Sequence, residues 1–592
     1  MDQVQQSSSK MMSMHHFASM IQKLASEIEP GKDWQPDAMD TIAHQLSAAA
    51  STVKTLRNAS VPLHRLPPEL LRAIFLAVLT DSPPGLAIDK FEGCHYRVEP
   101  KPPIHTLQSL QLVCSLWRNI VRPFPRLWSR IFADENTSYQ EIDAFTERSG
   151  NTPLDVTFLN ADQLGDILCQ HMDRVQFLDI ASDFDSGLGV QDASYTDFMD
   201  QQAPILERFR LMLADDIDTY IPLSFFSGFA PHLTHLSLRR AHPWRTPGLP
   251  ELAHLYVAGA PEDSDSTSSE AFLNFLDRSP KLEEIILVDA GPESHIVDFP
   301  GPSTRRAHLP RLHTVVIRRC HLRTLACVLH HVVPASGVAI EMKSVHETQA
   351  SIYIEAILKD CAFAAHARSP TDFSIWIQQS GRFTFSCRSD TGSLTFNIML
   401  PPSWALEDIV GALTSSLPHF LQLEAVLRLY VDIGHFSWTS HTARPVRKIL
   451  HAMRNVQYCT FRVHDKKSLN HGPSFLYRTP ESPAPGQLPS IKSLNFVCNK
   501  DVPLEWERIQ QIAMSRDLHG CWLRELICAE VYGGNQDSDM RPVSRDFGKH
   551  DLSDIDASRF QPPDFVHFSY VEEHTYDVPD VRGWNGQIWR NL

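Results

Sequence analysis

An apolar spacing that returns along most of the chain constrains the fold more than any other sequence feature. An apolar residue is followed by apolar residues at +3 and +5, and a small residue, Asn or Cys often stands at +8. Residues at +3 and +5 share one face of a β-strand, so each copy predicts a strand with one buried face. The copies begin at Val175, Leu206, Leu233, Leu252, Leu282, Leu312, Val426, Val456, Ile491 and Leu523.

This spacing resembles the leucine-rich repeat, L-x-x-L-x-L-x-x-N/C, in which each repeat adds one parallel strand to a horseshoe. Three successive copies lie about 30 residues apart, near the long end for this class, and the other intervals vary. Segments between copies, such as 269–278 and 321–333, have helical periodicity. We therefore predict an α/β repeat fold, an irregular leucine-rich-repeat-like solenoid over residues 153–535. A generic α/β fold with alternating strands and helices is the alternative.

Two interruptions and a tail depart from the repeat. Dense strand patterns at 373–377, 383–387 and 394–398, joined by Gly-containing turns, predict antiparallel hairpins. Residues 466–487 form a polar, proline-rich stretch that we interpret as a loop. The acidic tail at 536–592 contains aromatic residues but no repeat, so we expect it to cap the array or to fold over its concave face.

Residues 1–60 contain two amphipathic patterns. Apolar residues step by three and four over 14–28, Pro30 and Gly31 interrupt the pattern, and the same stepping returns over 39–56. The simplest prediction is a helical hairpin. The apolar stripes are also narrow enough for a coiled-coil seam, which leaves self-association open.

Residues 61–132 contain two shorter helical patterns separated by a proline-rich surface loop at about 80–105. The first follows Pro67 and Pro68, which fit a helix start. The second is predicted to begin at the N-cap Thr106 and to end at Pro123. These helices carry more apolar surface than they can bury against each other. Either the rest of the chain or a second protein must cover it.

Three motifs in this block together resemble an F-box. Residues 66–71 read Leu-Pro-Pro-Glu-Leu-Leu, residues 112–118 read Leu-Val-Cys-Ser-Leu-Trp-Arg, and residues 125–128 read Pro-Arg-Leu-Trp. The resemblance implies docking onto the Skp-family adaptor of an SCF-type cullin–RING ubiquitin ligase. It assigns these residues to the adaptor contact: Leu66, Pro67, Leu70, Leu71, Ile74, Phe75, Val113, Cys114 and Trp117.

The block departs from a typical F-box in one respect, because that motif runs from its first helix to its second without the insertion at 80–105. The linker at 133–152, a short helix ended by Ser149 and Gly150 before a strand, is similar to that of mushroom-lineage fungal F-box proteins. The resemblance implies a substrate-recognition subunit that tethers a target protein for ubiquitination. A leucine-rich-repeat scaffold that acts outside ubiquitination is the alternative.

Composition and charge exclude several other functions. The formal net charge of −16 argues against a general nucleic-acid surface. No run of about 18 apolar residues predicts a membrane span, and no signal peptide is expected. The 11 cysteines are unclustered, which is typical of reduced thiols in the cytosol or nucleus.

No catalytic constellation is found, and we expect neither an enzyme nor a bound cofactor. The best metal-like group is Cys320, His321, Cys327, His330 and His331. Its spacing matches no standard zinc site, so we interpret it as core cysteines and surface histidines and expect no metal.

Overall fold

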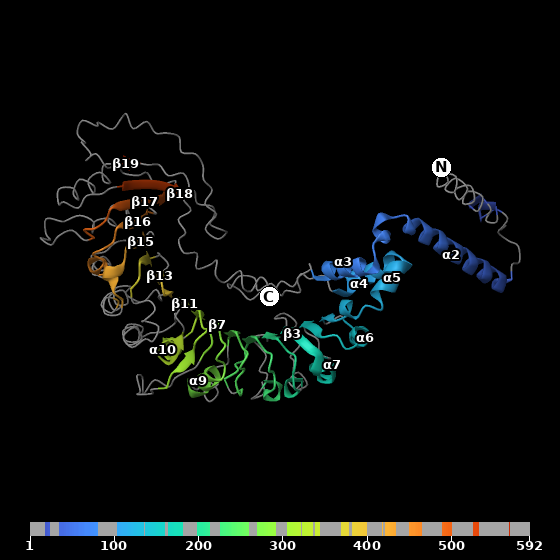
Figure 1. The fold of residues 1–592 in the computed structure, drawn as a ribbon, viewed down its shortest axis with the longest axis horizontal. Helices are drawn as coiled ribbons and strands as arrows, with labels where there is room; N and C mark the ends of the chain where they lie inside the picture. Colours follow the sequence, from blue (N-terminus) through green and yellow to red (C-terminus); the bar gives the residue numbers. More distant parts are fainter. Residues whose placement is uncertain are drawn as a thin grey trace. The chain divides into compact units, whose positions relative to one another are not determined.

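A computed structural model covers the chain and divides it into two compact units (Figure 1). Unit 1 comprises residues 1–81 and 105–124, and unit 2 comprises 82–104 and 125–592. The boundary at Phe124 therefore falls inside the predicted 61–132 block. The structure describes residues 18–19, 21–23, 26, 35–80, 103–134, 137–159, 164–181, 198–212, 225–244, 246–259, 269–291, 305–320, 322–334, 338–343, 369–377, 382–399, 417, 421–433, 449–463, 488–499, 525–531 and 567–568.

The described residues of unit 1 form helices joined by short turns and contain no strand. Its elements are α2 (Pro36–Ala59), the short 3-10 helix η1 (Pro62–Arg65), α3 (Pro68–Thr80), α4 (Pro103–Val113) and α5 (Ser115–Val121). The helix predicted over 39–56 is confirmed as α2. The helix predicted over 14–28 and the insertion from 81 to 102 lie largely outside the described residues, so the hairpin stays a prediction.

Helix α3 begins as its sequence predicts. The Pro67 carbonyl accepts hydrogen bonds from the backbone N–H groups of Leu70 and Leu71, at 3.0 and 3.2 Å. Proline at this end loses no helical hydrogen bond, because the first N–H groups of a helix have no partner within it. Glu69 adds a negative charge in the first turn, where the helix dipole favours it.

The prediction of one helix from Thr106 to Pro123 is wrong. Helix α4 already begins at Pro103, so Thr106 lies inside it. Cys114 is extended, with φ −164° and ψ 170°, and separates α4 from α5. Its Sγ accepts a hydrogen bond from the Trp117 backbone N–H at 3.5 Å and so caps α5. The apolar periodicity continues through this break, and for that reason the sequence pattern does not reveal it.

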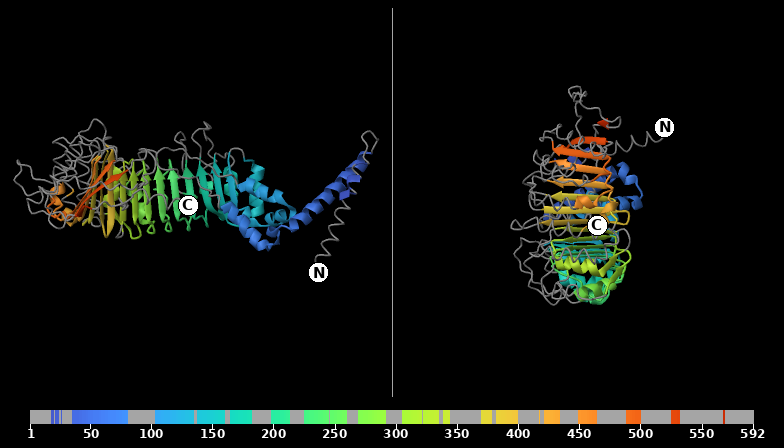
Figure 2. Two further views of the ribbon diagram at one scale, coloured as in Figure 1. Left: turned by 90° about the horizontal axis from the view of Figure 1, so that it is seen from above. Right: turned by 90° about the vertical axis from the view of Figure 1, so that its left-hand side faces the viewer.

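Unit 2 is a mixed α/β structure built on one 17-stranded sheet among its described residues. From β1 to β7, each strand pairs in parallel with the next along the chain, and Figure 2 shows them side by side. The sheet continues through β9, β11, β14, β13, β12, β15, β16, β17, β18 and β19. Two further strands, β8 (Ala307–Leu309) and β10 (Val332–Pro334), pair with each other.

Each predicted repeat copy supplies one strand of this sheet. These strands are β3 (Val175–Ala181), β4 (Arg208–Met212), β5 (His235–Arg239), β6 (His254–Ala258), β7 (Glu284–Val288), β9 (Thr314–Arg318), β15 (Arg428–Ile433), β16 (Tyr458–Val463), β17 (Ser493–Asn499) and β18 (Glu525–Val531). The remaining strands are β1 (Arg130–Ala133), β2 (Leu154–Leu159), β11 (Val338–Lys343), β12 (Asp372–Ile377), β13 (Arg382–Ser389), β14 (Gly392–Met399) and β19 (His567–Phe568).

The apolar residues at +3 and +5 form the core of unit 2. In β6, for example, Leu255 and Val257 are fully buried, as are Ile285 and Leu287 in β7. Helices α7 (Leu164–His171), α9 (Ser269–Asp277) and α10 (Leu322–His331) lie on one side of the sheet (Figure 1). The linker helix α6 (Tyr139–Ser149) begins with a capping box formed by Ser138 and Glu141, and Gly150 follows its end.

The same turn follows four successive strands, at position +7 of each repeat. Arg240, Gly259, Asp289 and Arg319 all have φ between 51° and 64°, in the left-handed region. Three of them donate their backbone N–H to the +6 carbonyl of the next repeat, at 2.7–2.8 Å. Successive repeats are therefore joined by one recurring hydrogen bond beyond the strand pairing.

Position +8 is a buried structural position, as expected. The Cys320 Sγ–H donates to the Ala290 carbonyl at 3.0 Å, and Ala241 and Ala290 occupy the same place in earlier repeats. Burial raises the pKa of the Cys320 thiol to about 12, so it stays protonated near neutral pH.

The predicted antiparallel hairpins are confirmed. Strand β13 pairs antiparallel with both β12 and β14. Strand β14 pairs in parallel with β11, and β12 in parallel with β15, so the sheet continues across the interruption. Gly392 permits this, because a Cβ there would lie 2.6 Å from the Val338 carbonyl oxygen.

Some expectations fall outside the described residues, among them the loop at 466–487 and nearly all of the tail at 536–592. No helix in the described ranges is long and apolar enough to cross a bilayer.

We predict that Leu255→Ala destabilises unit 2 by about 2–5 kcal/mol, because it opens a cavity at a fully buried +3 position. Leu427→Ala is the matched control, since Leu427 is 38% exposed beside β15 and its truncation should change stability by less than about 0.5 kcal/mol. Urea denaturation followed by circular dichroism measures both. Equal effects would contradict the assigned burial.

Candidate protein-docking surface

Exposed large apolar side chains are concentrated in unit 1. Of the fifteen that are more than about one-third exposed in the described part of the chain, eleven belong to unit 1. The four in the much larger unit 2 are Tyr139, Phe229, Leu427 and Tyr458. Single exposed apolar residues are normal on a folded protein, whereas a concentration of them is typical of an interaction surface.

Helix α3 carries two apolar stripes, each at four-residue spacing. Leu71, Phe75 and Leu79 are 1–3% exposed and pack inside unit 1. One residue earlier at each step, Leu70, Ile74 and Val78 are 51%, 40% and 44% exposed. A shift of one residue turns a side chain by about 100° around a helix. The helix therefore buries one stripe and presents the other to solvent.

The junction of α4 and α5 exposes a second set of apolar side chains. Leu112 is 76% exposed, Val113 is 53% exposed and Leu116 is 38% exposed. The extended Cys114 lies between them and is half-buried. The helix break thus leaves three large apolar side chains uncovered within five residues.

Trp117 of α5 packs against α3 and η1. Its ring centroid lies 4.8 Å from that of Phe75 and 6.1 Å from that of His64. His64 Nε2 is also 3.9 Å from Cys114 Sγ. The Trp117 Nε1 atom is buried and has no hydrogen-bond partner in the described structure. The indole is therefore held by packing.

The structure separates the predicted adaptor-contact residues into three groups. Pro67, Leu70, Ile74 and Val113 are exposed, and Leu66, Cys114 and Trp117 are half-buried. Leu71 and Phe75 are buried in the core of unit 1, so their side chains offer almost no free surface.

Sequence reasoning did not include three exposed residues of the same segments, which are Val78, Leu112 and Leu116. The four-residue step from Leu70 through Ile74 could have indicated Val78. Leu112 and Leu116 flank the break at Cys114, which carries no periodic signal.

The third F-box-like motif, residues 125–128, belongs to unit 2. Leu127 and Trp128 are buried, and the Trp128 ring packs edge-on against Phe145 with centroids 5.1 Å apart. The Arg148 guanidinium lies 4.5 Å from the centre of the same indole. This motif therefore connects the first strand, β1, to helix α6.

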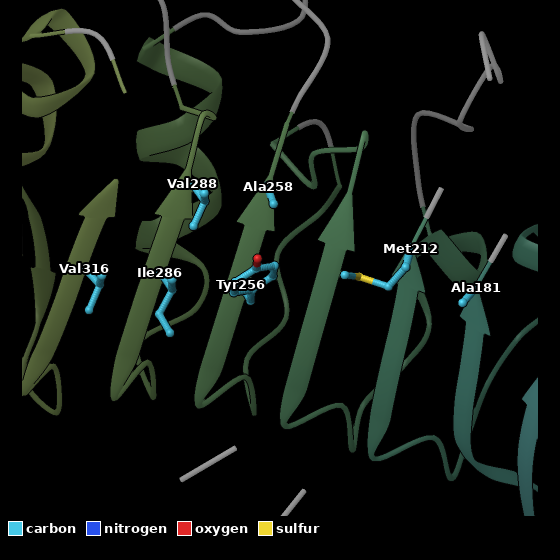
Figure 3. Close-up of a cluster of buried hydrophobic side chains, with 7 residues drawn as sticks. All are labelled: Ala181, Met212, Tyr256, Ala258, Ile286, Val288 and Val316. Atoms are coloured by element: carbon cyan, nitrogen blue, oxygen red, sulfur yellow. The ribbon is translucent and has the colours of Figure 1, made fainter. Parts of the chain in front are cut away.

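The sheet of unit 2 has a second face, opposite the +3 and +5 residues. Figure 3 shows its apolar cluster, which is buried and consists of Ala181, Met212, Tyr256, Ala258, Ile286, Val288 and Val316. Its apolar cluster is not a free surface in this structure, because every member is less than 9% exposed.

Polar side chains on this face are paired across neighbouring strands. Arg210 pairs with Asp179 through two contacts, and Arg130 Nε lies 3.3 Å from an Asp155 carboxylate oxygen. Burial raises the pKa of Asp155, against the opposing effect of the Arg130 charge. Two of the arginines on this face are therefore paired with aspartates of neighbouring strands.

A pair of histidines on neighbouring strands β5 and β6 lies on the same face of the sheet. The rings of His235 and His254 stack with centroids 4.4 Å apart, and His254 Nδ1 lies 3.3 Å from a Glu284 carboxylate oxygen. Burial first, and then the positive charges of His254 and Arg208, lower the pKa of His235 to about 4. His235 is therefore neutral near neutral pH.

No metal centre emerges among the residues that the structure describes, since no three of their His, Cys, Asp or Glu side chains are grouped to hold an ion. Cys320 and Cys327 are buried thiols whose pKa values burial raises to about 12 and 11. His321 lies outside the described residues.

A scan against models of protein families finds no match for this chain, and a search of curated proteins finds no significant one. The F-box and leucine-rich-repeat resemblances therefore rest on the motif residues and on the apolar spacing.

We predict that Trp117→Ala destabilises unit 1 by about 3 kcal/mol, the low end for a truncated core aromatic, because this ring is only half-buried. Trp117→Phe should cost much less, since the indole Nε1 has no partner to lose. Thermal unfolding of the full chain measures both variants. An equal loss in the two would show that the indole N–H, not ring packing, holds the residue.

Proposed function

We propose that this chain is the substrate-recognition subunit of an SCF-type E3 ubiquitin ligase, acting in the cytosol or nucleus. Unit 1 would dock onto the Skp-family adaptor, and unit 2 would hold the target protein. The observation that carries the proposal is the exposed apolar stripe of α3, Leu70, Ile74 and Val78, in the segment whose sequence resembles an F-box.

The energetics of this stripe favour a protein partner. Covering one large apolar side chain contributes roughly 1.5–3 kcal/mol. Together with Leu112, Val113 and Leu116, the stripe gives six large apolar side chains that unit 1 leaves exposed. Protein interfaces have an apolar centre that is depleted in charged residues, which fits this composition.

The proposed mechanism is tethering. One unit binds the ligase and the other binds the target, so a target lysine meets the ubiquitin thioester at raised effective concentration. The chemistry of ubiquitin transfer belongs to other subunits. The chain would supply position and specificity, and no catalytic group.

We further propose that unit 2 is an irregular leucine-rich-repeat-like solenoid. Three observations support this: the sequential parallel pairing from β1 to β7, the buried +3 and +5 residues, and the left-handed residue at +7 in four successive repeats. Such arrays bind proteins through extended surfaces.

A scaffold that acts outside ubiquitination is the second candidate. The burial of Leu71 and Phe75 favours it, because these residues of the F-box-like motif serve the internal core of unit 1. The two candidates differ in whether the exposed stripe binds the Skp-family adaptor.

We predict that the intact chain co-purifies with its Skp-family adaptor and that Leu70→Asp combined with Ile74→Asp lowers recovery at least tenfold. Loss of a central interface residue costs about 2 kcal/mol or more, and about 1.4 kcal/mol corresponds to tenfold. Both side chains are exposed, so the melting temperature should change little.

Leu427→Asp is the matched control, because it places the same charge at an exposed leucine of unit 2 and should leave recovery unchanged. Absence of the adaptor from the intact chain, or unchanged recovery with the double variant, would remove the ligase proposal.

Cysteine alkylation provides an independent footprint. Cys114 and Cys169 are half-buried, whereas Cys320, Cys327 and Cys387 are buried thiols with raised pKa values. We predict that iodoacetamide modifies the first two faster, because the reactive species is an accessible thiolate. Adaptor binding should slow modification of Cys114 at least several-fold and leave Cys169 unchanged, as read by peptide mass spectrometry. Equal protection of both would contradict docking at the α4–α5 junction.

A further inference from the structure

Helix α2 has an apolar stripe that unit 1 does not bury. The stripe follows alternating steps of three and four residues through Met39, Ile42, Leu46, Ala49, Val53 and Leu56. This is the a/d pattern of three heptads, the spacing that packs two helices along a narrow seam.

The exposure of this stripe contrasts with that of α3. Met39, Leu46 and Leu56 are 38%, 40% and 59% exposed, and the other three stripe residues are only half-buried. On α3, Leu71 and Phe75 are each 1% exposed. Both helices belong to unit 1, so α2 lacks the internal packing that α3 has.

The stripe is complementary to itself when a second α2 runs antiparallel. Residue numbers that sum to 95 then face each other across the seam: Met39 faces Leu56, Ile42 faces Val53, and Leu46 faces Ala49. Each a position meets a d position, and the small Ala49 leaves room for Leu46.

The charges of α2 favour the same orientation. Asp37 and Asp40 lie in its first turns, whereas Lys54 and Arg57 lie near its end. An antiparallel pair places the acidic end of one copy beside the basic end of the other. A parallel pair would place like charges together at both ends.

The residues that flank the seam permit close approach. Apart from Arg57 they are small or uncharged, namely Ala38, Ala43, Gln45, Ala50, Thr52 and Ala59. A row of like charges at these positions would repel a second copy of the helix. The sequence has no such row here.

From the exposed heptad stripe and its segregated charges we propose that α2 pairs antiparallel with α2 of a second copy of this chain. The protein would then be a homodimer joined by a short two-stranded coiled coil. This pairing does not require the adaptor. It can therefore be tested independently of the proposed function.

Light scattering of the full chain during size-exclusion chromatography, at tens of micromolar, tests the dimer. We expect twice the monomer mass of 67.0 kDa. Leu46→Asp places a charge in the seam and should return the mass to that of the monomer. Ser51→Asp, on the opposite face of α2, is the control and should stay dimeric. Melting curves show that both variants fold.

Cross-linking tests the orientation. Copies with Met39→Cys and copies with Leu56→Cys are mixed and oxidised, and the linked peptides are identified by mass spectrometry. The antiparallel pair gives the 39–56 link between chains. The 39–39 link should be absent, because 17 residues of helix place those positions about 25 Å apart.

A monomeric intact chain at all concentrations would overturn the proposal, and so would a Leu46→Asp variant that remains dimeric. A 39–39 link between chains would overturn the antiparallel arrangement. A link within one chain between Lys23 and Lys54, formed in a monomer by a lysine-reactive cross-linker, would identify the N-terminal segment as the actual cover of the stripe.

Discussion

The structure of unit 2 depends on the burial of two apolar side chains per repeat on one face of a parallel sheet. A single strand with Leu at +3 and +5 cannot hide those side chains alone, whereas a row of such strands stacks them into a continuous core. Leu255 and Val257 on β6 are covered in this way beside Ile285 and Leu287 on β7. The buried side chains of each strand therefore lie beside those of the neighbouring strands.

This dependence explains why the strands could be predicted while the turns that follow them could not. The +3 and +5 spacing records which side chains are buried, so it located a strand at every copy, including the irregular ones after residue 426. The left-handed turn at +7 was not predicted from the sequence. Three of its four residues, Arg240, Asp289 and Arg319, are not glycine, the residue that usually indicates such a turn. A hydrogen bond to the next repeat stabilises the turn at Arg240 and Asp289, and no local pattern reports such a bond.

In unit 1, the sequence pattern predicted the helices but not the burial of their individual side chains. Its periodicity identified apolar helices but could not say which side chains their own unit covers. On α3, Leu70 and Leu71 are adjacent leucines in the same motif, yet one is 51% exposed and the other 1%. Phe75 of α3 is covered by Trp117 of α5, and their ring centroids lie 4.8 Å apart. The sequence pattern of α3 alone does not specify the position of α5. The break at Cys114 was missed for a related reason, because an N-cap made by a sulfur atom leaves the apolar spacing undisturbed.

The two units therefore differ in how many of their large apolar side chains they bury. This difference bears on function. In unit 2, Arg130 and Arg210 pair with aspartates of neighbouring strands, and the apolar cluster on the same face is buried. Among its described residues, unit 1 leaves eleven large apolar side chains exposed on α2, η1, α3, α4 and α5 and at the turn after α2. Covering several of them would contribute an amount comparable with the roughly 5–15 kcal/mol by which typical domains are stable. For this reason our proposals place protein binding first in unit 1, where the exposed side chains of α3 and those of α2 are separate sets of residues.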